Sequence, residues 1–184
     1  MSNWYYLMAQ LPSFSIEQNA PLPITEKYVT ELCSRFLDKK TFLTLKNISL
    51  QPPVQPIKTG SNLVDAWYSQ ERQLRLALAQ IRALKMKKQF NVPVRSMPPD
   101  VLQVARTATG FESPLDAEMY LVKARINALE SLRPLEEFSS DALFAYVLKL
   151  KLTLRLNKFN VEKGKSSYQT IYSKILGQST GDNT

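Results

Sequence analysis

Histidine is absent from this chain of 184 residues, and cysteine occurs only once, as Cys33. Without histidine, the chain cannot build a Ser-His-Asp triad, a Cys-His pair or the commonest zinc sites. A single cysteine excludes an internal disulfide and a thiolate metal cluster. Cys33 falls beside Leu32 in a predicted amphipathic helix, so we interpret it as a buried, inert thiol. We therefore expect no catalytic residue, no metal and no cofactor.

Glycine is also scarce, with five residues, and no glycine-rich loop precedes a predicted helix. Neither of the common phosphate-binding loops is therefore expected. Glu112, Asp116 and Glu118 surround a predicted helix start, where acidic side chains favour the helix dipole, and we interpret them as structural. The rival interpretation, an enzyme that uses carboxylates alone, requires them to line a pocket with perturbed pKa values.

Long apolar runs are missing as well, since none approaches the ~18 residues that a membrane-spanning helix needs. The first eleven residues have no basic region and no small-residue cleavage site, so we expect no secretory signal. The consistent expectation is a cytoplasmic protein.

Proline is commoner and clustered, and its clusters divide the chain. We predict an N-terminal segment with one or two helices (1–48), a Pro-rich connector (49–60), a main helical body (61–177) and a frayed tail (178–184). The length fits one structural domain overall.

Apolar residues recur at helical spacing through most of the chain. The predicted helices span about residues 25–37, 61–88, 100–108, 113–133, 141–159 and 161–176. Thr25, Ser61 and Ser113 are the expected N-caps. The aromatic run Trp4–Ala9 is interpreted as a short strand or an extended anchor. The sequence thus predicts an all-α helical bundle of about six or seven helices, with room for a short extended N-terminal segment.

Two details of these helices carry specific expectations. Leucine alternates strictly with polar residues from Leu148 to Leu156, which is typical of a half-buried strand. The surrounding 19 residues without Gly or Pro favour a helix that is buried on more than one side. Tyr28 and Leu84 are expected on the buried faces of their helices.

The charge balance is lopsided, with 24 basic and 16 acidic residues, a net charge of +8 and a pI near 9.6. Basic residues concentrate in 61–90 and 141–176, whereas 91–140 is slightly acidic. Such regions fit a solvated basic surface, a docking face for an acidic protein, or an RNA- or DNA-binding surface. Composition leaves these three interpretations open.

Three segments, in this order, resemble a known family: Trp67–Lys88 (WYSQERQLRLALAQIRALKMKK), Ser113–Leu132 (SPLDAEMYLVKARINALESL) and Leu143–Phe159 (LFAYVLKLKLTLRLNKF). The opening also matches a Y-Y-L-x-A-x-L-P pattern that begins at Tyr5. Together they resemble an uncharacterised bacterial family encoded in the operons of V/A-type ATPases. That family is similar to part of the socket subunit of these enzymes, which is designated C in the archaeal type and d in eukaryotes.

This resemblance implies a non-catalytic helical socket that seats the central stalk on the membrane ring of a V/A-type ATPase or ATP synthase. It implies partners among the stalk and ring subunits, no small-molecule substrate, and a peripheral location at the inner face of the membrane. The predicted partner-binding residues are the cations of the two basic regions: Arg72, Arg75, Arg82, Lys149, Lys151 and Arg155. The alternative function is a helical RNA- or DNA-binding module that uses the same basic helices.

Three further side chains are expected to serve the bundle itself. Arg125 should pair inside it, with Glu118 or Glu130 as the nearest candidates along the chain. Tyr120 and Tyr146 are expected in the core, each with a satisfied hydroxyl group.

Overall fold

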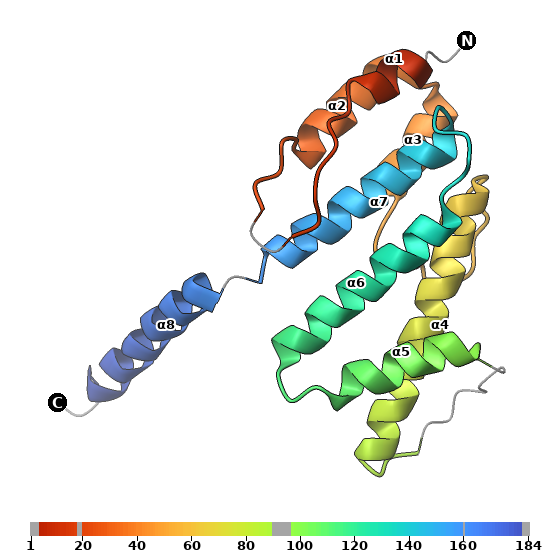
Figure 1. Ribbon diagram of the computed structural model, residues 1–184. Helices are drawn as coiled ribbons and strands as arrows, with labels where there is room; N and C mark the ends of the chain where they lie inside the picture. Colours follow the sequence, from red (N-terminus) through yellow and green to blue (C-terminus); the bar gives the residue numbers. More distant parts are fainter. Residues whose placement is uncertain (1–3, 18–19, 90–96, 160, 182–184) are drawn as a thin grey trace.

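The computed structural model describes residues 4–17, 20–89, 97–159 and 161–181, and this part of the chain contains helices and no strand. Its eight helices are α1 (Trp4–Ala9), α2 (Glu26–Phe36), α3 (Lys39–Asn47), α4 (Asn62–Lys85), α5 (Pro99–Gly110), α6 (Pro114–Leu132), α7 (Ser140–Asn157) and α8 (Val161–Gly181). The predicted all-α bundle is confirmed. Helices α1–α7 form one body, and α8 projects away from it (Figure 1).

The predicted N-caps are confirmed in detail. Side-chain oxygens of Thr25, Ser61 and Ser113 each accept a hydrogen bond from the backbone N–H three residues later, at 3.2–3.3 Å. These bonds satisfy N–H groups that have no partner within their helices. Asp141, in the first turn of α7, accepts a further bond from the Ser61 hydroxyl at 2.6 Å. The start of α4 is thereby tied to the start of α7.

Helix α7 is the centre of the body, and α2, α3, α4 and α6 all pack against it. Ten of its eighteen residues are buried, including Leu148, Leu150 and Leu152. The alternating leucines therefore belong to a helix buried on most sides, as the segment length indicates. The buried Thr153 hydroxyl donates to the Lys149 carbonyl at 2.9 Å, so this polar group is satisfied within the helix.

The core has two parts. The larger joins α1, α2, α3 and α7 with the first half of α4 and contains Trp67, which is almost fully buried. The smaller lies between α4, α5 and α6 and contains small residues such as Ala77, Ala105 and Ala108. Because α4 contributes to both parts, it connects the N-terminal helices to the α5–α6 pair.

The N-terminal segment differs from the sequence-based expectation, because Trp4–Ala9 is helical rather than extended. Trp4, Leu7, Met8 and Leu11 are spaced as on one face of a helix, and all four join the larger core. Tyr5, on another side of α1, stacks on Phe138 with ring centroids 4.2 Å apart. Packing of this apolar face outweighs the strand preference of the aromatic residues.

Three further features differ from the sequence-based predictions: the exposure of Tyr28, the exposure of Leu84 and the length of α8. Tyr28 and Leu84 are exposed, the latter because the last turn of α4 buries the side of Ala83 instead. Helix α8 runs to Gly181, four residues into the tail predicted to be frayed, and residues 182–184 lie outside the described part.

Candidate functional site

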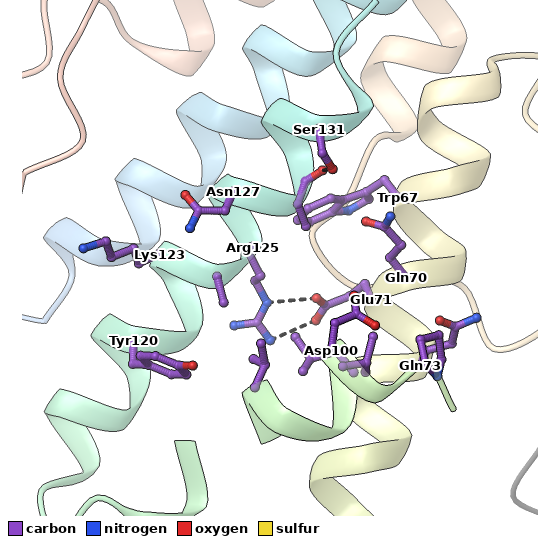
Figure 2. Close-up of a pocket in the computed structure, with 16 residues that line it drawn as sticks. Trp67, Gln70, Glu71, Gln73, Asp100, Tyr120, Lys123, Arg125, Asn127 and Ser131 are labelled. Atoms are coloured by element: carbon purple, nitrogen blue, oxygen red, sulfur yellow. Dashed lines mark hydrogen bonds and ion pairs between the residues drawn. The ribbon is translucent and has the colours of Figure 1, made fainter. Parts of the chain in front are cut away.

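A cleft of about 520 Å³ opens between α4, α5 and α6. The α4 wall includes Trp67, Gln70 and Glu71, and the α6 wall includes Tyr120 and Arg125 (Figure 2). The start of α5 closes the third side. The cleft combines apolar walls with a few convergent polar groups, which is the usual make-up of a ligand or partner pocket.

Glu71 is the chemical centre of this cleft. Its side chain is only 1% exposed. Arg125 donates from Nε to Glu71 Oε2 at 2.9 Å and from Nη2 to Glu71 Oε1 at 3.0 Å. Arg75 Nε donates to the same Oε1 at 2.7 Å. Two guanidinium groups thus share one buried carboxylate, and through Arg125 that carboxylate holds α4 against α6.

Three buried polar atoms in the cleft walls have no hydrogen-bond partner among the described residues: Trp67 Nε1, Gln70 Oε1 and Arg125 Nη1. In Figure 2, one terminal nitrogen of Arg125 points away from Glu71. Burial of an unpaired polar group costs free energy, so these atoms mark the least satisfied part of the interior.

Arg125 corrects one sequence-based expectation. It does pair inside the bundle, but with Glu71 on α4 and not with Glu118 or Glu130. Those two carboxylates bind cations of α7 instead. The physical reason is that α6 turns its Arg125 face toward α4, and its Glu118 and Glu130 toward α7.

The two tyrosines have different outcomes. Tyr146 is half-buried against the larger core, and its hydroxyl is satisfied as predicted, since it donates to the Pro12 carbonyl at 2.8 Å. Tyr120 is only half-buried and lies at the edge of the smaller core, with its ring 5.6 Å from that of Phe111.

The three predicted partner-binding cations of α7 all have carboxylate partners within the chain. Lys149 pairs with Glu130 on α6 at 3.2 Å, and Arg155 pairs with Glu118 on α6 at 2.6 Å. Lys151 pairs with Glu26 at the start of α2. These ion pairs bridge α7 to its neighbours, so much of the basic charge of α7 is compensated locally.

The three predicted cations of α4 lie in different surroundings. Arg72 donates from Nη2 to the Pro53 carbonyl at 2.8 Å and so anchors the Pro-rich connector. Arg75 binds Glu71 but remains 42% exposed. Arg82, near the end of α4, is exposed and takes part in none of the ion pairs of the described residues. Five of the six predicted residues are thus bound within the chain, four to a carboxylate and Arg72 to a backbone carbonyl.

Helix α8 carries a second candidate site. Tyr168, Ile171, Tyr172 and Ile175 are all more than half exposed. Their spacing places them on one face of the helix, and the two tyrosine rings stack with centroids 6.0 Å apart. We call this face the α8 stripe. The sequence shows the same spacing, but it does not reveal that the face lies outside the bundle.

The buried carboxylate Glu71 is the residue at the centre of the cleft that sequence reasoning missed. Its signal was present, because Glu71 lies between Trp67 and Leu74 in the apolar stripe of α4. A charged residue at such a position is rarely buried unless it is paired. Of the acidic residues near the start of α6, Glu118 binds Arg155, whereas Glu112 and Asp116 are exposed.

Within the described residues, no group of three metal-binding side chains has the geometry to hold an ion. None of the helices in this part of the chain combines the length and apolarity that crossing a bilayer requires. Comparisons of the chain with protein-family models, curated proteins and solved structures find no match.

Proposed function

We propose that this chain is a non-catalytic accessory subunit of a bacterial V/A-type ATPase or ATP synthase. In this proposal it acts as a helical socket between the central stalk and the membrane ring. The family resemblance of the sequence suggests the machine. The three segments that bear the resemblance form α4, α6 and α7, the helices that pack around the Glu71–Arg125 pair and the central core.

The observation that best supports a docking role is the α8 stripe. Most helical stability in proteins comes from packing of an apolar face, and α8 leaves such a face exposed over its 21 residues. The stripe offers two isoleucines and two tyrosines, and α8 is not among the helix pairs that pack closely within the described residues. A protein partner would bury this face and stabilise the helix at the same time.

The chemistry of α8 indicates what kind of partner fits. The stripe has the i, i+3, i+4, i+7 spacing that packs against another helix. Lys165 and Lys174 lie on α8 outside the stripe, so acidic side chains on the partner would complement it. A long helix of the central stalk meets this description. The α1–α7 body would then sit on the ring, and rotation would pass between ring and stalk through this chain.

Copurification from membranes of the organism that makes the chain tests this proposal. Ile171→Asp with Ile175→Asp places two charges in the stripe. Thr170→Asp with Ser173→Asp places the same charges on the opposite, exposed face of α8 as a matched control. We expect the wild type and the control to recover stalk and ring subunits. The stripe variant should recover at least about tenfold less of these subunits.

The proposal would be overturned if the wild-type chain recovered none of the ATPase subunits. Equal recovery of these subunits by all three chains would instead exclude α8 as the docking element. Nucleic acid in the wild-type eluate, released steeply by salt, would favour the RNA- or DNA-binding alternative.

A further inference from the structure

The far end of α4 gathers exposed cations that no ion pair within the described residues neutralises. These are Arg82, Lys87 and Lys88 at the end of α4 and Arg106 on α5, with Lys85 beside them. The carboxylates that flank these cations along the chain are Glu71 on α4, Asp100 in the first turn of α5, and Glu112, which follows the end of α5. We call this end of the body the basic tip. In Figure 1 it lies at the lower end of α4, away from α1, α2 and α3.

The backbone fixes the shape of the tip. The N–H of Lys88 donates to the Ala83 carbonyl at 2.9 Å, and that of Lys87 donates to the Leu84 carbonyl at 3.1 Å. These two bonds form a Schellman motif, which requires a left-handed residue, and Lys87 takes that place with φ 53°. Lys85 donates from Nζ to the Thr109 carbonyl, which brings the end of α5 to the same tip.

Large apolar side chains protrude beside these cations. Leu84 is 68% exposed and Met86 is 61% exposed, and Phe111 follows the end of α5 with 41% of its surface exposed. The helix dipole accounts for cations in the last turn of α4, but it gives no reason for exposed leucine and methionine next to them. Apolar side chains that are rimmed by charge at one end of a molecule typically mark an interaction site.

We propose that the basic tip binds the surface of an anionic phospholipid bilayer. Lys and Arg side chains would meet the lipid phosphates, while Leu84 and Met86 enter the boundary between headgroups and acyl chains. Nucleic acid would pair with the cations through its phosphates, but it would not bury the protruding apolar side chains. An acidic protein would need a complementary groove, whereas a fluid bilayer accepts side chains that protrude from a convex end. This contact is separate from the α8 stripe and does not depend on the proposed function.

Vesicle cosedimentation of the purified full-length chain tests the proposal. The vesicles contain phosphatidylcholine alone or with about one third phosphatidylglycerol. Lys87→Gln with Lys88→Gln removes two cations from the tip, and Leu84→Ser with Met86→Ser removes its apolar side chains. Matched controls at the other end of the body are Lys39→Gln with Lys40→Gln for charge, and Leu135→Ser for exposed apolar surface.

We expect the wild type to bind only the anionic vesicles and to dissociate at high salt. Each removed lysine should weaken binding about fivefold, the equivalent of ~1 kcal/mol per cation. The apolar tip variant should weaken it at least about fivefold, and both controls should bind like the wild type. Absence of binding to anionic vesicles, or equal binding by tip variants and wild type, would overturn the proposal.

Two further outcomes would contradict the tip proposal, one by placing the membrane contact on α8 and the other by identifying nucleic acid as the ligand of the tip. Loss of vesicle binding in the Ile171→Asp/Ile175→Asp variant alone would assign the membrane contact to α8 and overturn the tip proposal. Loss of RNA binding in the lysine tip variant, with no vesicle binding by any chain, would assign the tip to nucleic acid. Neither outcome requires ATPase subunits, so the tip and the proposed function fail independently.

Discussion

Arg125 and Glu71, 54 residues apart in the chain, meet through two parallel hydrogen bonds in the wall of the α4–α6 cleft. Their side chains are 11% and 1% exposed. Two-point contact between a guanidinium and a carboxylate adds directional specificity to the strength of a charged hydrogen bond. It fixes the register of α6 against α4.

Arg125→Met should lower the free energy of unfolding by ~3 kcal/mol, because it leaves the buried Glu71 charge with one exposed partner. Arg75→Gln should cost less than ~1 kcal/mol, since Arg75 is substantially solvated. The double variant Glu71→Leu with Arg125→Met should recover most of the loss. Urea unfolding of the four chains measures these differences, and equal costs for Arg125 and Arg75 would contradict the assignment.

Tyr146 should make stability fall in alkaline solution. Burial raises the pKa of its hydroxyl from 10.0 to about 12. Between these values the unfolded chain holds fewer protons than the folded one, so stability is complete below pH 10 and is lost as pH rises toward 12. Tyr146→Phe should remove this part of the slope. It should also cost ~1 kcal/mol at pH 7, because the hydrogen bond to Pro12 is lost.

The test is the difference in the free energy of unfolding between wild type and Tyr146→Phe at about pH 7, 9 and 11, a range that begins below the ordinary pKa of tyrosine and ends inside the interval in which stability is lost. Because the two chains differ only at position 146, this difference isolates the contribution of the Tyr146 hydroxyl. A difference that stays constant across this range would show that Tyr146 titrates normally.

Lys87→Gly should stabilise the protein by ~1 kcal/mol, because Lys87 occupies the left-handed position that ends α4, where a side chain strains the backbone and glycine does not. Lys88→Gly removes the same charge at a residue whose φ is not positive and should bring no gain. Thermal unfolding of both variants measures the change in stability. A neutral or destabilising effect of Lys87→Gly would contradict the strain argument.

Cys33 should react with thiol reagents only when the chain unfolds. The side chain is fully buried, and desolvation raises its pKa from 9.0 to about 11, so very little thiolate exists near neutral pH. The rate of labelling by a disulfide reagent should therefore rise in parallel with the unfolded fraction as urea is added. Rapid labelling in buffer without urea would show that the α2 face is open.

Helix identity and helix starts were predictable from the sequence, because capping residues and apolar spacing are local properties. Thr25, Ser61 and Ser113 needed only their own neighbours to be recognised as caps. The helix at Leu148–Leu156 was recognised from its length and composition, although its alternation is typical of a strand. The local sequence pattern was sufficient to predict those features that depend on a single segment.

The remaining features depend on which segments pack against each other in the folded chain. The spacing of residues along the sequence does not determine this. Arg125 was expected to pair within its own region, whereas its partner Glu71 lies on another helix. Trp4–Ala9 was expected to be extended, because its packing into the larger core is not visible along the chain. The exposure of the α8 stripe likewise depends on where α8 lies in relation to the body.

Membership of a V/A-type ATPase is tested most directly by native mass spectrometry of that ATPase, purified from the chain's own organism through a tag on a catalytic subunit. We predict that the membrane-bound complex contains this 21.0 kDa chain, and that the chain leaves together with stalk or ring subunits when the complex is dissociated. A complete, active complex that lacks the chain would contradict its role as a socket.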